Sequence, residues 1–303
     1  KFWGKKDLNI FAILLIPLTL IIIFSNWINF FFPKKKFKIK TICIGNIYLG
    51  GTGKTPLSIE VYKILKELRI KSVFIKKNYF EHKDEIKLLS KVGPIISLKS
   101  RKKSIEEAQR KKFKVAIIDD GLQDRSLDYD LKILCFDKEN FIGNGKLIPA
   151  GPLRENLNSI KKYDIVFLNG LKKNNKNIIL KLNEKNNKLK IFETHPIITN
   201  LKKIKKNKNY LIFSGIGNPD SFRKLLKKNN LKISKSISYP DHYEYSKSDI
   251  YFIKNQAKTL KSKILTTEKD YLRIKKEYRS GINFIKIKLD IDKKKRFIEL
   301  LKN

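Results

Sequence analysis

From residue 40 onward, short apolar runs alternate with segments whose apolar residues recur at helical spacing. The runs are rich in Ile, Val, Leu and Phe, which is typical of buried strands. In the first part of the chain we expect strands at residues 40–47, 71–76, 94–98, 114–119, 131–137 and 164–168. Helical patterns lie between them at residues 56–68, 84–91 and 104–112. This alternation predicts an α/β fold with a mostly parallel sheet and flanking helices.

A second α/β pattern follows a polar stretch late in the chain. Residues 174–187 are predicted to form a helix and loop, and the lysine- and asparagine-rich residues 202–209 resemble a linker. Beyond them, strands are expected at residues 210–214, 233–238, 262–266 and 282–287, and helices at residues 220–228, 247–260 and 292–301. We therefore predict a larger domain over residues 34–201 and a smaller α/β domain over residues 202–303.

The N-terminal segment has a different pattern, because residues 8–32 contain no charged side chain. A membrane span needs about 20 apolar residues. Pro17 falls inside the run, and five lysines follow it within residues 34–40. We expect residues 1–33 to form a membrane-associated helix that either crosses the bilayer or lies in its interface, with residues 34–303 in the cytoplasm. The chain has no Met and begins at Lys1, so we expect that its first residues are missing.

Charge adds a prediction about partners. The chain has 68 Lys and Arg against 29 Asp and Glu, a formal net charge of +39. The lysines occur in nearly every segment, so we expect a solvated basic surface attracted to anionic lipid instead of a nucleic-acid-binding stripe. Cys43 and Cys135 fall in predicted strands without the spacing of a zinc site, so they are expected to be buried free thiols.

The first predicted strand ends in a glycine-rich turn, GNIYLGGTGKTP, at residues 45–56. Strand, glycine turn and helix start are the layout of a phosphate-binding loop, although the strict pattern has glycine where Tyr48 stands. An ordinary strand-to-helix turn is the alternative. In the phosphate-binding interpretation, Lys54 reaches the outer phosphates of a nucleotide and Thr55 binds Mg²⁺. The nucleotide-binding residues are then Gly50, Gly51, Thr52, Gly53, Lys54 and Thr55.

Three further features carry candidate chemistry. Asp119 and Asp120 end a buried apolar run, where P-loop proteins place the carboxylate that holds Mg²⁺, although Asp-Asp-Gly is also a common turn. Residues 143–155 are dense in Gly and Pro and include Arg154, which favours a loop that approaches a phosphate ligand. His242 lies in a loop between a strand and a helix, and from the residues alone it is best interpreted as a surface histidine.

Six motifs occur in a fixed order: GNIYLGGTGKTP, DDGLQD, GNGKLIPAGPLREN, FSGIGNP, YPDHY and TTEKD. Together they resemble the tetraacyldisaccharide 4′-kinase family, the lipid A kinases of Gram-negative bacteria, over most of the chain. The resemblance implies transfer of the ATP γ-phosphoryl group, with Mg²⁺, to the 4′-hydroxyl of a tetraacylated glucosamine disaccharide 1-phosphate. It also implies a location at the cytoplasmic face of the inner membrane and a smaller C-terminal domain over the active site.

The resemblance also implies roles for individual residues. Asp119 and Asp120 match the family's acidic pair, and Glu155 is expected to assist in binding Mg²⁺. The family's catalytic Asp lies in a Gly-Asp-Glu-Pro stretch after an Arg-Gly-Tyr-Gly loop. Here the nearest match is KDEI at residues 83–86 after KNY at residues 77–79, so Asp84 is the implied base and His242 its partner.

This chain departs from the family pattern in two places. The loop before Asp84 has lost its glycines, and Asp124 stands where the family has the His of its Asp-Asp-Gly-X-Gln-His motif. From the residues alone, Asp84 would be one more charge on the solvated face of a helix.

Two other classes of function fit parts of the pattern. A membrane-associated P-loop ATPase of the partitioning or targeting type would also use a Gly-Lys-Thr loop, and it would release free phosphate instead of a phosphorylated glycolipid. It gives no role to residues 143–155 or to YPDHY. A basic nucleic-acid-binding protein requires clustered lysines and aromatic residues on one face, so we expect no nucleic-acid partner.

Overall fold

The computed structural model describes residues 9–28, 33–79, 83–171 and 174–302. The chain divides into two compact units. The first unit consists of Lys1–Asn78, Gly93–Thr194 and Ile291–Asn303, and the second of Tyr79–Val92 and His195–Asp290. The sequence suggested a single division near residue 202. In the structure, a short internal segment also belongs to the second unit and the C-terminal residues belong to the first.

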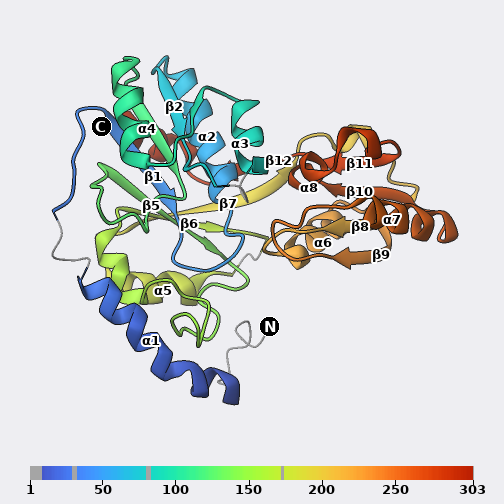
Figure 1. The fold of residues 1–303 in the computed structure, drawn as a ribbon, viewed down its shortest axis with the longest axis horizontal. Helices are drawn as coiled ribbons and strands as arrows, with labels where there is room; N and C mark the ends of the chain where they lie inside the picture. The colour runs from blue at the N-terminus through green and yellow to red at the C-terminus, as the bar shows by residue number, and fades with distance from the viewer. Residues whose placement is uncertain (1–8, 29–32, 80–82, 172–173, 303) are drawn as a thin grey trace. The chain divides into compact units, whose positions relative to one another are not determined.

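The larger sheet has eight strands in the order β12-β7-β6-β5-β1-β4-β2-β3 (Figure 1). The strands are β1 (Lys40–Gly45), β2 (Ser72–Ile75), β3 (Ile95–Ile96), β4 (Val115–Asp119), β5 (Leu131–Asp137), β6 (Ile165–Asn169), β7 (Lys190–Ile198) and β12 (Ile287–Ile291). All neighbouring strands from β7 to β3 are parallel. The predicted mostly parallel α/β sheet is therefore confirmed.

The helices of the first unit are α1 (Ile10–Ile28), α2 (Lys54–Glu67), α4 (Arg101–Arg110), α5 (Lys176–Lys185) and α9 (Lys294–Lys302). Helix α9 was expected in the C-terminal domain. Its Phe297 is fully buried and meets the rings of Phe167 on β6 and Phe192 on β7 edge-on, at centroid distances of 4.9 and 5.4 Å. These aromatic contacts explain why the end of the chain belongs to the first unit.

The second unit contains a parallel four-stranded sheet in the order β11-β10-β8-β9 (Figure 1). Its strands are β8 (Asn209–Ser214), β9 (Lys232–Ser238), β10 (Lys263–Thr267) and β11 (Ile282–Ile285). Its helices are α3 (Lys83–Ser90), α6 (Pro219–Lys228), α7 (Lys247–Thr259) and α8 (Glu268–Arg273). The central strand β8 is buried along most of its length, as its apolar sequence predicts.

Three local predictions need correction. The His195-Pro196 pair predicts a turn from its sequence, because proline is common in turns, but it lies inside β7. The pairing of β7 with β6 ends at Thr194, so the missing N–H of Pro196 removes no hydrogen bond from that ladder. The single strand expected at residues 282–287 is two strands, β11 and β12. Helix α8 was not anticipated, because six residues are too few to show helical periodicity.

Helix α1 carries the uncharged N-terminal run, with Pro17 inside it. Most of its described apolar side chains are exposed, among them Phe11 at 61% and Leu14 at 69%. Residues 1–8 and 29–32 of the expected anchor lie outside the described residues, as does His82, which the sequence predicts to be a solvated loop residue. Among the residues that the structure does describe, no helix is long and apolar enough to cross a membrane, so the expectation of a spanning helix is not supported.

Candidate active site

The phosphate-binding loop connects the buried strand β1 to helix α2, which begins at Lys54. Gly53 adopts a φ of 85°, in the left-handed region that glycine enters without a steric penalty. A Cβ atom at this position would also collide with the side chain of Asn169. The loop therefore needs glycine here, and its backbone N–H groups lie at the positive end of a 14-residue helix.

Two asparagine side chains fix the shape of this loop. The amide nitrogen of Asn46 donates to the carbonyl of Tyr48 at 2.6 Å, the carbonyl of Gly50 at 3.2 Å and the hydroxyl of Thr52 at 3.0 Å. The amide of Asn169, at the end of β6, donates to the carbonyl of Thr52. Because both amides lie in the interior, water competes little for these hydrogen bonds, which hold the loop in this conformation.

The Gly- and Pro-rich residues 143–155 lie against the phosphate-binding loop. The N–H of Leu49 donates to the carbonyl of Pro152 at 2.8 Å, and the N–H of Arg154 donates to the carbonyl of Ile47 at 2.7 Å. Tyr48, which replaces the expected glycine, forms an antiparallel bridge with Leu153. The departure at Tyr48 is therefore accommodated by pairing between the two loops.

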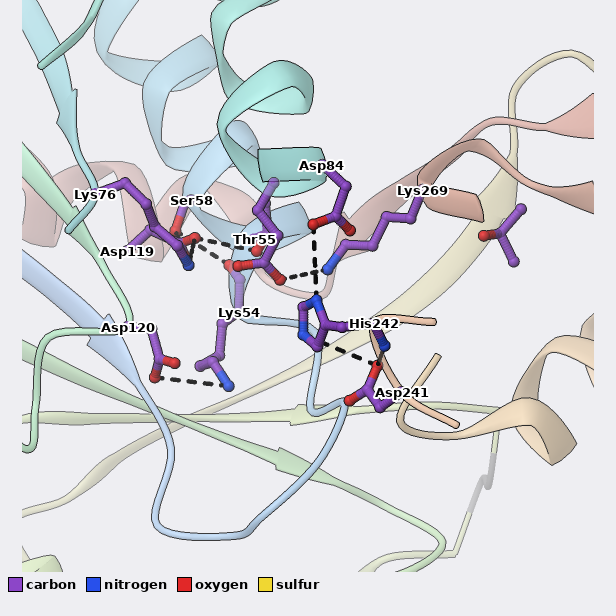
Figure 2. A network of polar contacts seen from close by, with 12 residues as sticks. Lys54, Thr55, Ser58, Lys76, Asp84, Asp119, Asp120, Asp241, His242 and Lys269 are labelled. Atoms are coloured by element: carbon purple, nitrogen blue, oxygen red, sulfur yellow. Dashed lines mark hydrogen bonds and ion pairs between the residues drawn. The ribbon is translucent and has the colours of Figure 1, made fainter. Parts of the chain in front are cut away.

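Asp119 lies at the carboxyl end of β4 and is fully buried. Its carboxylate accepts hydrogen bonds from the Thr55 hydroxyl at 3.1 Å, the Ser58 hydroxyl at 3.0 Å and the Lys76 ammonium at 2.8 Å (Figure 2). A carboxylate and a hydroxyl are oxygen ligands of the kind that Mg²⁺ prefers, so Thr55 and Asp119 fit the ion. Lys76 is 2% exposed and supplies a positive charge at the same carboxylate.

Lys76 is not among the site residues predicted from the sequence. Strands β2 and β4 are parallel neighbours with Ile75 paired to Ile118, so the residues that follow, Lys76 and Asp119, meet at the same edge of the sheet. The available signal was a lysine directly after one buried strand and an aspartate ending another. Using that signal required knowing that these two strands are adjacent.

The remaining charged residues predicted for this site have other neighbours. Asp120 adopts a φ of 61°, and its carboxylate lies 3.6 Å from Lys54 (Figure 2). The same carboxylate lies 3.7 Å from Arg154. Glu155 is buried and accepts a hydrogen bond from the Tyr163 hydroxyl at 3.2 Å. Asp120 therefore lies beside the two cationic side chains of the site, Lys54 and Arg154, whereas the carboxylate of Glu155 points toward Tyr163.

Asp84 and His242 both belong to the second unit, although the sequence placed them in different domains. Asp84 is in the first turn of α3 and is 4% exposed, so it is not on a solvated face. His242 Nδ1 lies 3.7 Å from Asp84 Oδ1 (Figure 2). This distance is longer than a formed hydrogen bond, and pairs of this kind often tighten only when substrate binds.

The environment shifts the pKa values of this pair in opposite directions. Burial alone would raise the pKa of Asp84, but the nearby His242 imidazole and the positive charges of Lys269 and Arg273 outweigh it and lower the value to about 2. The facing Asp84 carboxylate raises the pKa of His242 above its usual value, against the opposing effect of burial. The pair can therefore accept a proton, because the ionised Asp84 carboxylate increases the proton affinity of the His242 imidazole.

Arg273 is a second site residue that was not predicted from the sequence, and its guanidinium lies 2.7 Å from Asp84 Oδ2. Arg273 is the last residue of α8, the helix that was not anticipated. The sequence did contain a capping signal at its start, because the Thr267 hydroxyl accepts a hydrogen bond from the N–H of Asp270 three residues later. The TTEKD motif therefore begins the helix that supplies Arg273.

The first unit has the strand, glycine loop and helix of a P-loop protein, and the second contains a carboxylate–imidazole pair. These features define the class as a P-loop phosphotransferase. The family model described as tetraacyldisaccharide-1-P 4′-kinase (LpxK) matches residues 11–93 and 83–303. The chain belongs to this family.

Individual relatives agree with the family match. A tetraacyldisaccharide 4′-kinase from Pelagibacter ubique is 45% identical, with 99% of this chain and 96% of the relative covered. The enzyme of that name from Rickettsia bellii is 36% identical over 90% of this chain and 88% of its own. An LpxK crystal structure from Aquifex aeolicus, in complex with ATP, has the same fold, with a TM-score of 0.69, 23% identity and 97% and 99% coverage.

Proposed function

We propose that this protein is the kinase that transfers the γ-phosphoryl group of ATP to the 4′-hydroxyl of a tetraacylated disaccharide 1-phosphate in lipid A biosynthesis. The observation that carries the proposal is the family match over nearly the whole chain. The phosphate-binding loop between β1 and α2 agrees with it. The Aquifex relative described in complex with ATP supports ATP as the donor.

The nucleotide site is proposed to lie at the start of α2. Residues 50–55 surround the phosphates, and Lys54 and Arg154 neutralise the charge that develops on the transferred group. Thr55 and Asp119 hold Mg²⁺, with Asp120 and Glu155 as further acidic residues of this region. When bound there, Mg²⁺ would supply positive charge that offsets the negative charge of the phosphates.

The acceptor hydroxyl is proposed to lose its proton to His242. Nδ1 of the neutral imidazole faces Asp84, so Nε2 is the nitrogen that accepts the proton as the acceptor oxygen bonds to the γ-phosphorus and the bond to the ADP oxygen breaks. Asp84 has a pKa of about 2, so it stays ionised and stabilises the imidazolium that forms. The base role implied for Asp84 therefore becomes a shared one, with the transferred proton residing on His242.

Two larger-scale features complete the proposal. Because the nucleotide loop and the acid–base pair belong to different units, the second unit is proposed to close on the first during the reaction. Helix α1 is proposed to lie in the interface at the cytoplasmic face of the inner membrane, supported by its exposed apolar side chains and by the lysines within residues 34–40.

The test is incubation with ATP, Mg²⁺ and a tetraacyldisaccharide 1-phosphate in mixed micelles, followed by mass analysis of the lipid. A gain of one phosphate on the lipid, matched to ADP production and absent in Lys54→Ala, supports the kinase. Lipid-dependent release of free phosphate with unchanged lipid would instead identify the membrane-associated ATPase.

A further inference from the structure

We propose that Arg273 is a positioning residue that holds the Asp84 carboxylate and the His242 loop in the orientation in which the two side chains face each other. The inference rests on the proposed function, because the pair matters only if it accepts the proton of the acceptor hydroxyl. It assigns a role to the TTEKD segment, which the catalytic scheme above does not use.

Arg273 fixes Asp84 through one of its two carboxylate oxygens. Nε and Nη2 of Arg273 donate to Asp84 Oδ2 at 3.1 and 2.7 Å. Oδ1, the other oxygen, is the one that faces His242. Both side chains are almost completely buried, at 5% and 2% exposure, so water competes little for these bonds. Because a carboxylate is planar, holding Oδ2 in this way also sets the direction of Oδ1.

The third nitrogen of the same guanidinium reaches the loop that carries His242. Arg273 Nη1 donates to the carbonyl of Gly215 at 2.5 Å. The same carbonyl accepts the backbone N–H of His242 at 3.2 Å. His242 is held there at a φ of 60°, a conformation that is uncommon for non-glycine residues. One side chain therefore connects the carboxylate to the backbone of its imidazole partner.

Asp270 also holds the Arg273 guanidinium in place through a hydrogen bond. Its Oδ1 accepts from Arg273 Nη1 at 3.1 Å, from the Tyr245 hydroxyl at 2.9 Å and from the N–H of Gly215 at 2.9 Å. Asp270 is itself fully buried. A lysine at position 273 would keep the positive charge but would lose the fork that contacts Asp84 and Gly215 at the same time.

The charged groups around the pair determine what its titration reports. Asp84 faces His242, Arg273, Lys269 and Glu85, and the pKa of His242 responds to Asp84, Asp241 and Glu85. Arg273→Lys retains the charge beside Asp84, so a change in the titration of His242 reports altered geometry between carboxylate and imidazole. A residue that served stability alone would leave the His242 pKa of the folded protein unchanged.

The experiment compares Arg273→Lys with Arg279→Lys. Arg279 belongs to the same unit and donates to the carbonyls of Ile274 and Leu272 at 2.9 and 3.2 Å, so it is a structural arginine with a separate set of partners. Arg273→Lys should lower kcat about 10- to 100-fold, the scale of a misplacement near 1 Å, without changing KM for ATP. Arg279→Lys should stay close to wild type.

Two further measurements make the assignment specific. The His242 imidazole, assigned in NMR spectra by its loss in His242→Ala, should titrate at lower pH in Arg273→Lys because it has lost its oriented carboxylate. In an Asp84→Asn background, Arg273→Lys should cost little more, since residues that act as one unit are non-additive. If Arg273→Lys fails to fold, Asp270→Asn loosens the same guanidinium and should shift kcat and the titration in the same direction.

Failure of the inference and failure of the proposed function give different results. The positioning role would be overturned if Arg273→Lys had the wild-type kcat and an unchanged His242 titration while Asp84→Asn remained strongly impaired. The kinase mechanism would then remain intact. Normal kcat in Asp84→Asn would remove the acid–base pair itself. Fully additive losses in the double variant would show that Arg273 acts independently of Asp84.

Discussion

The buried ion pair between Lys76 and Asp119 makes a sharp prediction about stability. Replacing Lys76 by Met keeps most of its length and apolar stem but removes the ammonium that lies 2.8 Å from the carboxylate. Asp119 would keep only the Thr55 and Ser58 hydroxyls as hydrogen-bond donors among the contacts described above. Among the described residues, the ion pair that Lys76 forms with this fully buried carboxylate would then be lost.

The expected cost follows from burial. The two side chains are 3% and 0% exposed, and breaking such a buried pair typically costs about 3–5 kcal/mol. For a domain of about 150–250 residues, 1 kcal/mol shifts the melting temperature by about 2–4 °C, so Lys76→Met should lower it by about 6–20 °C.

The chain offers a matched control. Lys132 and Asp128 form the same kind of pair at the same 2.8 Å distance, but their side chains are 28% and 40% exposed. Solvent screening reduces such pairs to about 0–1 kcal/mol, so Lys132→Met should shift the melting temperature by at most about 4 °C. Circular dichroism melts, with hydrogen exchange at β4 amides to localise the effect, provide the comparison.

A third variant tests the cause directly. Adding Asp119→Asn to Lys76→Met removes the unpaired charge, so stability should partly recover although nucleotide-dependent activity does not. If Lys76→Met costs no more than Lys132→Met, or if Asp119→Asn gives no recovery, the carboxylate does not depend on Lys76 for its charge compensation.

Three further predictions concern activity and pH. Lys54→Ala should reduce lipid phosphorylation at least about 100-fold with an unchanged melting curve, because the transition-state charge loses its cation; near-normal turnover would contradict the phosphate-binding role. Gly215→Ala should lower kcat but not KM for ATP, since its Cβ would lie 2.8 Å from the Pro240 carbonyl and displace the His242 loop, and a crystal structure of the variant would show the shift. Lowering the pKa of Asp84 from 3.8 to about 2 stabilises the fold by about 2 kcal/mol above pH 4, and this contribution is lost as the pH falls through 2. The raised pKa of His242 stabilises the fold below pH 6.5, and that contribution is lost as the pH rises through the pKa of His242 in the folded protein. Denaturant titrations across pH should show both slopes flattened in Asp84→Asn.

The parts that the sequence predicted well depend on local chemistry. Strands β1, β4 and β5 are continuous apolar runs because a parallel sheet buries both faces, and such runs can be recognised without knowing their neighbours. The phosphate-binding loop is also local, since strand, glycine turn and helix start follow one another directly. The bounds of these elements therefore agree with expectation to within a few residues.

The parts that were missed depend on which elements become neighbours. Lys76 meets Asp119 only because β2 pairs with β4, and nothing in either strand's own sequence states that pairing. Residues 79–92 likewise belong to the second unit, and not to the first unit that surrounds them in the sequence, because α3 packs against α8. Position along the chain predicts neither relationship, because both are set by contacts between distant residues.

Asp84 shows how these two kinds of information combine. Its residue type and helix suggested a solvated charge, and only the family resemblance implied a catalytic role. In the structure it is buried, which by itself would make a carboxylate costly and raise its pKa. The pKa is nevertheless about 2, because His242, Lys269 and Arg273 converge on the carboxylate from a loop and a short helix far along the chain. An arrangement that offsets the cost of burying a charge next to a histidine is expected where that charge has a function, and this is the physical basis for proposing Asp84 and His242 as the acid–base pair.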